Sequence, residues 1–228
     1  MEKLILSDFQ FSVDEESFLS AVNIDIEDDP DLAEEALEVL RAGLGLARPK
    51  AVCICLPTEV SGTTVNIGGV SFENGFVAQK LSSSGICVPY VATCGAESAK
   101  WAASLTDPMH VWWAQELMLK TLSCAMKEVC AAVKSRWFPN APHVTALNPG
   151  SLEHWPITGQ KDLFAMLSGG AEEIGVELTP SMLMLPHKSG SGIFFSSSRE
   201  YENCELCPRT DCPNRRAEFS GNTDWRLK

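Results

Sequence analysis

The chain has 228 residues, of which 45% are hydrophobic and 21% charged, and its formal net charge is −12. This composition is that of a globular protein and excludes a disordered chain. The acidic balance argues against nucleic acid as a partner, because binding a phosphate backbone requires a concentrated basic face.

The N-terminal segment MEKLILSDFQ lacks the basic stretch and long apolar run of a secretory signal. No stretch has the roughly 18 uninterrupted apolar residues that a membrane span needs. We therefore expect a cytoplasmic protein without a membrane partner. We expect one α+β domain over residues 1–228, with a helical N-terminal region at 1–50 and a cysteine-rich tail at 200–228.

The first strongly patterned segment is DDPDLAEEALEVLRAGLG, which predicts a helix. Asp29 is placed to cap the first free amides and Pro30 suits the first turn. Gly43 and Gly45 are expected to end this helix. The apolar runs at 51–57 and 86–95 then predict two buried strands, with a short helix between them.

The second half begins with the strongest helical pattern, at 106–137, where apolar residues occupy more than one helix face. Such a helix is expected to be central and buried on several sides. A further helix is predicted at 157–170 with Thr158 as its cap, followed by a strand, a turn at HKSGSG and another strand. The pattern as a whole indicates a mixed α+β fold.

The tail contains three cysteines, Cys204, Cys207 and Cys212, in a C-x2-C-x4-C spacing. In a reducing compartment, clustered thiols predict metal ligands before disulfides. An iron–sulfur cluster or a zinc ion needs a fourth ligand. Cys94, in a turn after a strand, is our candidate, because a bend in the backbone can expose its side chain. Spacing alone does not separate iron–sulfur from zinc, and a reduced tail without metal stays a third alternative.

A second candidate site is the segment LNPGSLEHWP. Asn148, Pro149, Gly150 and Ser151 predict a turn whose backbone groups are free to bind a small ligand. His154 supplies a polar tip beside it, although a histidine with only a structural hydrogen bond is the more ordinary interpretation. A plain surface turn is the alternative for the whole segment.

Several common catalytic motifs are absent from the sequence. It has no H-E-x-x-H zinc motif, no G-x-S-x-G nucleophile motif and no glycine-rich phosphate loop. We therefore assign no catalytic residue, and whether the protein is an enzyme stays open.

Two segments together resemble the activation domain of cobalamin-dependent methionine synthase. Pro149 and Gly150 match a turn of the form A-P-G-Y, and the region of clear similarity is residues 145–197. A second family segment, L-T-E-S-x-A-M-x-P-x-x-S-V-S-G, is matched at Leu178, Thr179, Ser181, Met184, Pro186, Ser189, Ser191 and Gly192. The resemblance implies an α+β fold with a twisted antiparallel sheet. It also implies S-adenosylmethionine binding and docking on a corrinoid protein.

Three positions depart from the family pattern. The family's arginine, four residues before the glycine, falls on Ala146, its tyrosine on Ser151 and its glutamate on Pro180. These changes remove side chains that the resemblance would assign to S-adenosylmethionine, whereas backbone contacts at 148–151 could persist.

Two hypotheses follow for the whole chain. The first is a stand-alone reactivation factor for a corrinoid-binding protein or methyltransferase, with an iron–sulfur cluster in the tail that delivers electrons to cobalt. The alternative is a non-redox binding module with structural zinc that recognises a corrinoid protein or S-adenosylmethionine.

Overall fold

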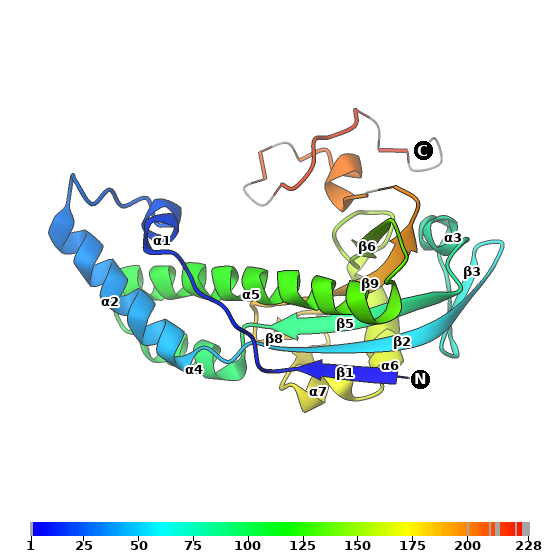
Figure 1. The fold of residues 1–228 in the computed structure, drawn as a ribbon, viewed down its shortest axis with the longest axis horizontal. Coiled ribbons are helices and arrows are strands. Elements are labelled where there is room, and N and C mark those ends of the chain that lie inside the picture. Colours follow the sequence, from blue (N-terminus) through cyan, green and yellow to red (C-terminus); the bar gives the residue numbers. More distant parts are fainter. Residues whose placement is uncertain (1, 200, 210, 213–214, 222, 225–228) are drawn as a thin grey trace.

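The structure is a computed structural model that describes residues 2–199, 201–209, 211–212, 215–221 and 223–224. Its centre is a seven-stranded antiparallel sheet in the order β4-β3-β2-β5-β9-β6, with β1 paired to β2 beside β3 (Figure 1). The sheet twists along its length and helices lie on both faces. The expected α+β fold with a twisted antiparallel sheet is therefore confirmed.

The strands of the main sheet are of very different lengths. They are β1 (Glu2–Leu6), β2 (Lys50–Ser61), β3 (Thr64–Ile67), β4 (Val70–Glu73), β5 (Ile86–Thr93), β6 (His143–Leu147) and β9 (Ser189–Ser197). A separate two-stranded sheet pairs β7 (Glu177–Leu178) with β8 (Met184–Leu185). The helices are α1 (Glu15–Ala21), α2 (Pro30–Leu46), α3 (Gly75–Leu81), α4 (Ala96–Ser104), α5 (Pro108–Trp137), α6 (Gln160–Leu167) and α7 (Gly170–Glu173), with 3-10 turns η1 (Ile157–Gly159) and η2 (Asn203–Leu206).

The alternation of side chains along β2 divides the core into two layers. Ala51 and Cys53 belong to the cluster that contains α5, whereas Val52 and Ile54 belong to the cluster that contains α3, α6 and α7. Successive side chains of a strand point to opposite faces, so one buried strand serves both layers. This arrangement explains why β2 and β5 have continuous apolar sequences rather than alternating ones.

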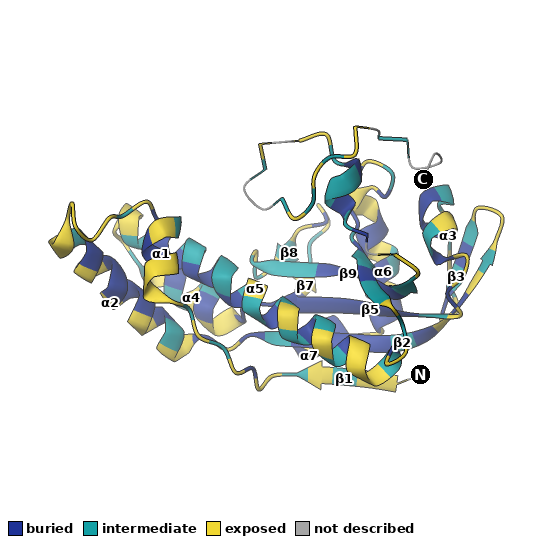
Figure 2. Cartoon of the chain, turned by 45° about the horizontal axis from the view of Figure 1, so that its top comes forward, coloured by how far each residue is buried: buried dark blue, intermediate teal, exposed yellow. Residues whose placement is uncertain are grey.

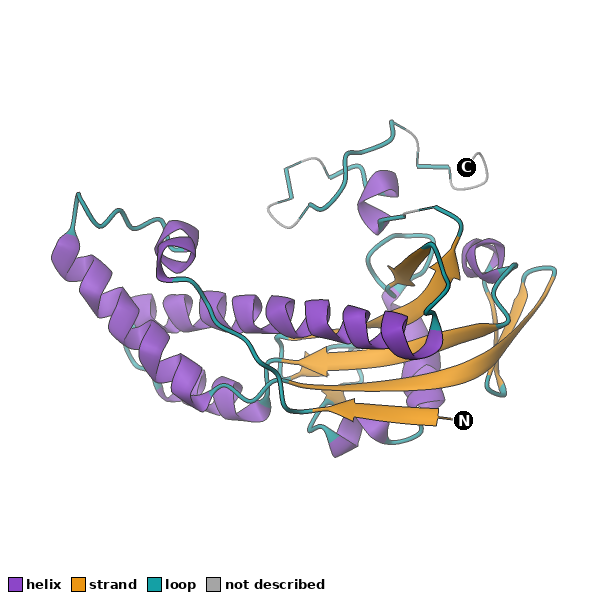
Figure 3. Ribbon diagram, viewed as in Figure 1, coloured by secondary structure: helices purple, strands orange, loops and turns teal. Residues whose placement is uncertain are grey.

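Beyond the sheet, α1, α2 and α4 pack on the N-terminal half of α5 and give the molecule its elongated shape (Figure 3). Asp29 caps α2 as predicted, accepting a hydrogen bond from the Leu32 N–H at 3.0 Å. The predicted end of this helix was wrong, because α2 continues through Gly43 to Leu46. Gly43 is needed for packing: a Cβ there would overlap Leu117 of α5 and Trp101 of α4.

Other differences concern the region around β9. The segment HKSGSG was expected to be a turn, but Ser189 already pairs with Thr93 and begins β9. The predicted cap Thr158 lies within η1, and α6 has no side-chain hydrogen bond at its N-terminus. Strand β6 was not predicted at all, although it forms the edge next to β9. Its sequence HVTAL is too short to be distinguished from a loop by periodicity.

The C-terminal segment after β9 crosses over the sheet end near β6 (Figure 1). Tyr201, Asn203 and Leu206 are buried, whereas the residues that follow are mostly half-buried or exposed (Figure 2). Within the described part of the chain, no helix is long and apolar enough to cross a membrane.

Candidate functional site: a groove between α5, β6 and β9

The predicted turn at 148–151 lines a groove of about 730 Å³. Its walls are apolar and come from α5, β6 and β9, and its far edge comes from the C-terminal segment. The apolar lining residues are Leu122, Met126, Val144, Ala146, Ile157, Met184 and Phe194. A concave, mostly apolar site with a few polar groups is the usual form of a small-molecule site.

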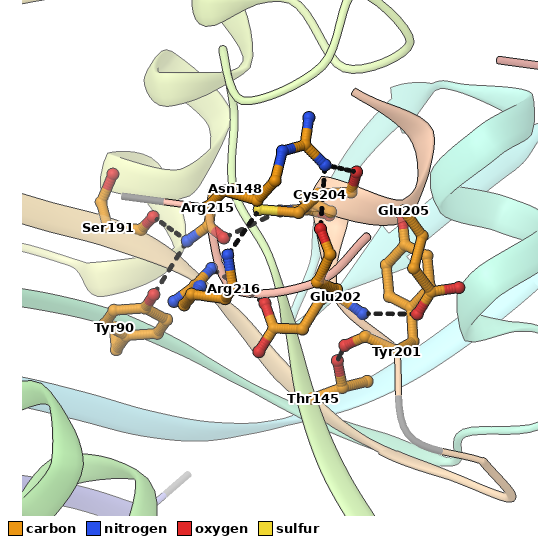
Figure 4. Close-up of polar contacts among 12 residues, drawn as sticks. Tyr90, Thr145, Asn148, Ser191, Tyr201, Glu202, Cys204, Glu205, Arg215 and Arg216 are labelled. Carbon is orange, nitrogen blue, oxygen red and sulfur yellow. Dashed lines mark hydrogen bonds and ion pairs between the residues drawn. The ribbon is translucent and has the colours of Figure 1, made fainter. Parts of the chain in front are cut away.

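Asn148 is the centre of the polar network at the floor of this groove (Figure 4). Its Nδ2 donates to the Tyr90 hydroxyl at 2.8 Å and to the Ser191 carbonyl at 2.7 Å. Its Oδ1 accepts from Nδ2 of Asn203 at 3.0 Å. The Ser191 hydroxyl in turn donates to Oε1 of Gln160 at 3.0 Å. Asn148 therefore joins three strands to the first residue of η2.

The close approach of Asn148 to β9 depends on Gly192. A Cβ at this position would overlap Nδ2 of Asn148 and the Leu147 carbonyl. Gly190, two residues earlier on the same strand, has open space where a Cβ would be. Strand β9 therefore needs a glycine at position 192 but has room for a side chain at position 190.

The turn itself has the backbone conformation that its sequence predicts. Gly150 has φ +83°, a conformation that favours glycine, and its N–H donates to the Trp155 carbonyl at 2.8 Å. The Ser151 N–H donates to the Asn148 carbonyl at 3.1 Å. Two backbone amides of the turn are therefore engaged internally. Ligand contacts at 148–151 stay a prediction.

His154 lies apart from the groove. Its Nε2 is 2.8 Å from the Thr223 carbonyl, and its ring contacts Phe76 of α3. Its own carbonyl accepts from Nδ2 of Asn74, the cap of α3. These contacts give His154 a structural role between α3 and the C-terminal segment, and it is absent from the residues that line the groove.

Arg215 holds the cysteine segment together. Its guanidinium donates to the carbonyl of Cys204 at 3.0 Å (Figure 4). It also donates to the carbonyls of Cys207 at 2.8 Å, Ala217 at 2.8 Å and Arg209. One cation therefore binds the main chain at several points of a segment that contains little regular structure. Charge-assisted hydrogen bonds of this kind are stronger than neutral ones.

The predicted metal ligands are not brought together. Among the residues that the structure describes, no group of three histidine, cysteine or acidic side chains is placed to hold a metal ion. Cys204 Sγ accepts from the Arg216 N–H at 3.5 Å, and Cys207 packs against the core layer of α3 and α6. In this conformation the thiols do not fit an iron–sulfur cluster or a zinc ion, and the metal site stays a prediction.

Cys94 differs from the expectation that a turn would expose it. It is fully buried in the cluster formed by Ala102, Ala114 and Met118, between β5, α4 and α5. Burial raises the pKa of its thiol to about 11, so the thiolate that a metal needs is disfavoured there. The chain continues from β5 into α4 at this point, and α5 covers the turn. The sequence could not show that cover.

Several residues of the groove were missed by sequence reasoning. Tyr90 and Gln160 sit in apolar or helical patterns that predict only core positions, and Glu202 and Arg216 sit beside the more conspicuous cysteines. Cys130 also lines the groove, from α5. No local signal identifies these residues, because the groove is formed by segments far apart in sequence.

Comparison with known proteins gives one informative result. No family model matches the chain, and no curated protein matches its sequence. Among solved structures, the fold is similar to that of the MetH reactivation domain bound to AdoHcy, with a TM-score of 0.61. The two share 16% sequence identity, and the match covers 89% of this chain and 81% of the other. At this identity, the similarity establishes the fold.

Proposed function

We propose that this protein is a reactivation factor for a corrinoid protein and that its groove binds an S-adenosyl ligand. The observation that carries the proposal is the position of the turn at 148–151. Residue patterns alone marked this turn as a ligand site, and it lines the 730 Å³ groove of a chain whose fold resembles the MetH reactivation domain. That solved domain was bound to AdoHcy.

Reactivation of a corrinoid requires that an electron and a methyl group meet at cobalt. One electron reduces Co(II) to Co(I), which takes the methyl group of S-adenosylmethionine and leaves methyl-Co(III) and S-adenosylhomocysteine. The corrinoid is a substrate carried by the partner, and an external reductant supplies the electron. The contribution of this chain is to hold the methyl donor in the groove and to bring it to the partner.

The groove has features suited to that task. Its apolar walls can bury a flat, weakly polar group such as an adenine ring. Ile157, which lines the groove, and Leu183 and Leu185, which flank the lining residue Met184, are exposed apolar side chains. A corrinoid protein docked over them would exclude water from the methyl transfer.

The direct test is a methylation assay. The cobalamin-binding part of a methionine synthase, loaded with Co(II) cobalamin, is mixed with a reductant, S-adenosylmethionine and this protein. We expect the Co(II) electron paramagnetic resonance signal to disappear and methylcobalamin to form only when this protein is present. Equal methylcobalamin formation without the protein, or none with it, contradicts the proposal.

A groove-filling variant ties the activity to the site. Ala146→Phe places a ring inside the groove, whereas Ala103→Phe makes the same change on the exposed surface of α4. We expect the first to reduce methylation at least about tenfold, which corresponds to about 1.4 kcal/mol, and the second to leave it unchanged. Equal rates for both variants would place the activity elsewhere.

A second candidate function is a binding module without redox activity, and the tail geometry favours it over electron delivery by the tail. The Arg215 side chain already binds the cysteine segment through backbone carbonyls. Elemental analysis and electron paramagnetic resonance on protein purified without oxygen decide between them. Iron in stoichiometric amount restores the iron–sulfur hypothesis; one zinc supports the structural-zinc alternative; no metal leaves the arginine-braced tail.

A further inference from the structure

The C-terminal segment brings two of the three charges that line the groove to one end of it. Among the described residues that line it, only Lys127, Glu202 and Arg216 carry a charge at neutral pH. Lys127 lies on α5, and the other two come from the C-terminal segment. The strands contribute no cation: Ala146 of β6 presents only a methyl group to the groove. The cations available to a charged end of a bound ligand are therefore Lys127 of α5 and Arg216 of the C-terminal segment.

Glu202 and Arg216 form an ion pair of 3.0 Å at this end (Figure 4). The Arg216 side chain is 63% exposed, so its guanidinium can be reached from the groove. An adjacent carboxylate and guanidinium are complementary to the ammonium and carboxylate groups of an amino acid. A guanidinium can bind a carboxylate through two parallel hydrogen bonds, which gives both strength and orientation.

The main chain of Arg216 is fixed by its neighbours. Its N–H donates to Cys204 Sγ at 3.5 Å, and the preceding Arg215 binds the carbonyls of the cysteine segment. Asn203, within the same segment, donates to Asn148 on the groove floor. The segment is thereby attached to the floor, which positions Arg216 above it.

The charge of Arg216 reaches the groove floor. Burial raises the pKa of Tyr90, while the hydrogen bond from Asn148 and the positive charge of Arg216 oppose that rise. The Tyr90 hydroxyl belongs to the Asn148 network. Tyr90 and Arg216 both line the groove, so one bound ligand can contact both side chains.

We propose that Arg216 is the carboxylate-binding residue of the groove, so that the C-terminal segment recognises the amino-acid end of an S-adenosyl ligand. This inference rests on the proposed function and deepens it. It gives the cysteine segment a role that needs no metal: the segment folds around Arg215 and thereby positions the adjacent arginine.

The test compares two nucleosides that differ only at the proposed end. S-adenosylhomocysteine carries the amino-acid group, and 5′-deoxy-5′-methylthioadenosine is the same adenosine thioether without it. We expect calorimetry to show tighter binding of the first to the unaltered protein. Arg216→Gln should weaken S-adenosylhomocysteine about 10- to 100-fold and leave methylthioadenosine within about threefold, because only the former has the carboxylate.

Two further variants separate recognition from folding of the segment. Arg209→Gln changes an exposed arginine of the same segment whose side chain pairs with Asp211, and both affinities should stay unchanged. Arg216→Lys keeps the charge but loses the planar fork, so it should restore part of the lost affinity.

Four results would overturn the inference. Equal weakening of both nucleosides by Arg216→Gln would mean that Arg216 only supports the fold. No weakening of either, or equal affinity of the two nucleosides for the unaltered protein, would remove amino-acid recognition but leave the groove as an adenosyl site. Binding of neither nucleoside would also contradict the S-adenosyl part of the proposed function.

Discussion

The floor of the groove and the segment that covers it are built in different ways. The floor consists of β5, β6 and β9, which are paired in one sheet and joined by the Asn148 network. The C-terminal segment has one short 3-10 turn and is anchored in the core by Tyr201 and Leu206. Its cysteine-containing part is held by hydrogen bonds from Arg215 to main-chain carbonyls. The difference indicates that the floor sets the shape of the site and the segment adds its charge.

If the floor sets the shape of the site, substitutions in the floor should lower the free energy of unfolding most. Gly192→Ala forces a Cβ against Asn148 and the Leu147 carbonyl, neither of which can move without disturbing β6. We expect unfolding in urea to show a loss of about 3 kcal/mol, at the upper end of the usual cost of overpacking. Gly190→Ala, on the same strand but facing open space, is the control and should change stability by less than about 0.5 kcal/mol.

Equal midpoints for these two variants would mean that the floor is looser than the structure describes. The floor would then not be the rigid part of the site.

A smaller effect is expected where the floor meets the segment. Asn148→Ala removes the partner of Asn203, Tyr90 and Ser191 at once and leaves buried polar groups unpaired. The expected loss is about 1–2 kcal/mol by urea unfolding. The half-buried Asn66 donates to Ser71 on the neighbouring strand β4 and accepts from the Gly69 N–H, away from the groove. Asn66→Ala therefore serves as the control for loss of an amide outside the network and should cost less than about 1 kcal/mol. A similar small cost for Asn148→Ala would show that the network contributes little.

The segment alone should respond to Arg215→Gln. Loss of its carbonyl contacts should accelerate hydrogen exchange at least about tenfold over residues 204–209, 211–212 and 215–217, because such local openings need little free energy. The overall free energy of unfolding should fall by less than about 1 kcal/mol, since the floor is unchanged. Arg209→Gln, whose side chain pairs only with Asp211 among the described ion pairs, should leave exchange unaltered.

Unaltered exchange in Arg215→Gln would show that something else holds the segment. A metal ion bound by the cysteines would be the first alternative to examine, and adding a chelator would reveal it.

The difference in burial between the sheet region and the C-terminal segment can also be measured on the unaltered protein, through the reactivity of its cysteines. At pH 8, iodoacetamide should label Cys204, Cys207 and Cys212 well before Cys94 in metal-free protein, because the tail thiols are only half-buried. Burial raises the pKa of Cys94 to about 11, so its thiol is protonated at pH 8 and labelling should increase as pH rises toward that value. Mass spectrometry of the labelled peptides gives the order; early labelling of Cys94 would contradict its placement.

The sequence predicted the features that depend on local patterns. The long helix α5, the cap at Asp29, the buried strands β2 and β5 and the turn at Gly150 all follow from residue types at short spacing. Features that depend on contacts distant in sequence were not predictable. Gly43 continues a helix because Leu117 and Trp101 pack against it, and β6 is a strand because β9 pairs with it.

The candidate site also has a part that local sequence patterns predicted and a part that depends on distant contacts. The turn at 148–151 was found because its residue types are unusual in one short segment. Arg216 was not found as a ligand-binding residue, because its role depends on how the C-terminal segment crosses the groove. The prediction for Cys94 failed for the same reason. Its place in a local turn suggested an exposed thiol, whereas its burial by α4 and α5 depends on contacts that the sequence does not show.

The central claim, an adenosyl ligand held between the sheet floor and the C-terminal segment, can be tested by a titration of ¹⁵N-labelled protein with S-adenosylhomocysteine, followed by amide chemical shifts. The account predicts saturable shifts at residues 148, 150 and 151, at 190 and 191, and at 216, with little change in α1 and α2. No saturable shift, or shifts confined to the helices far from the groove, would contradict it.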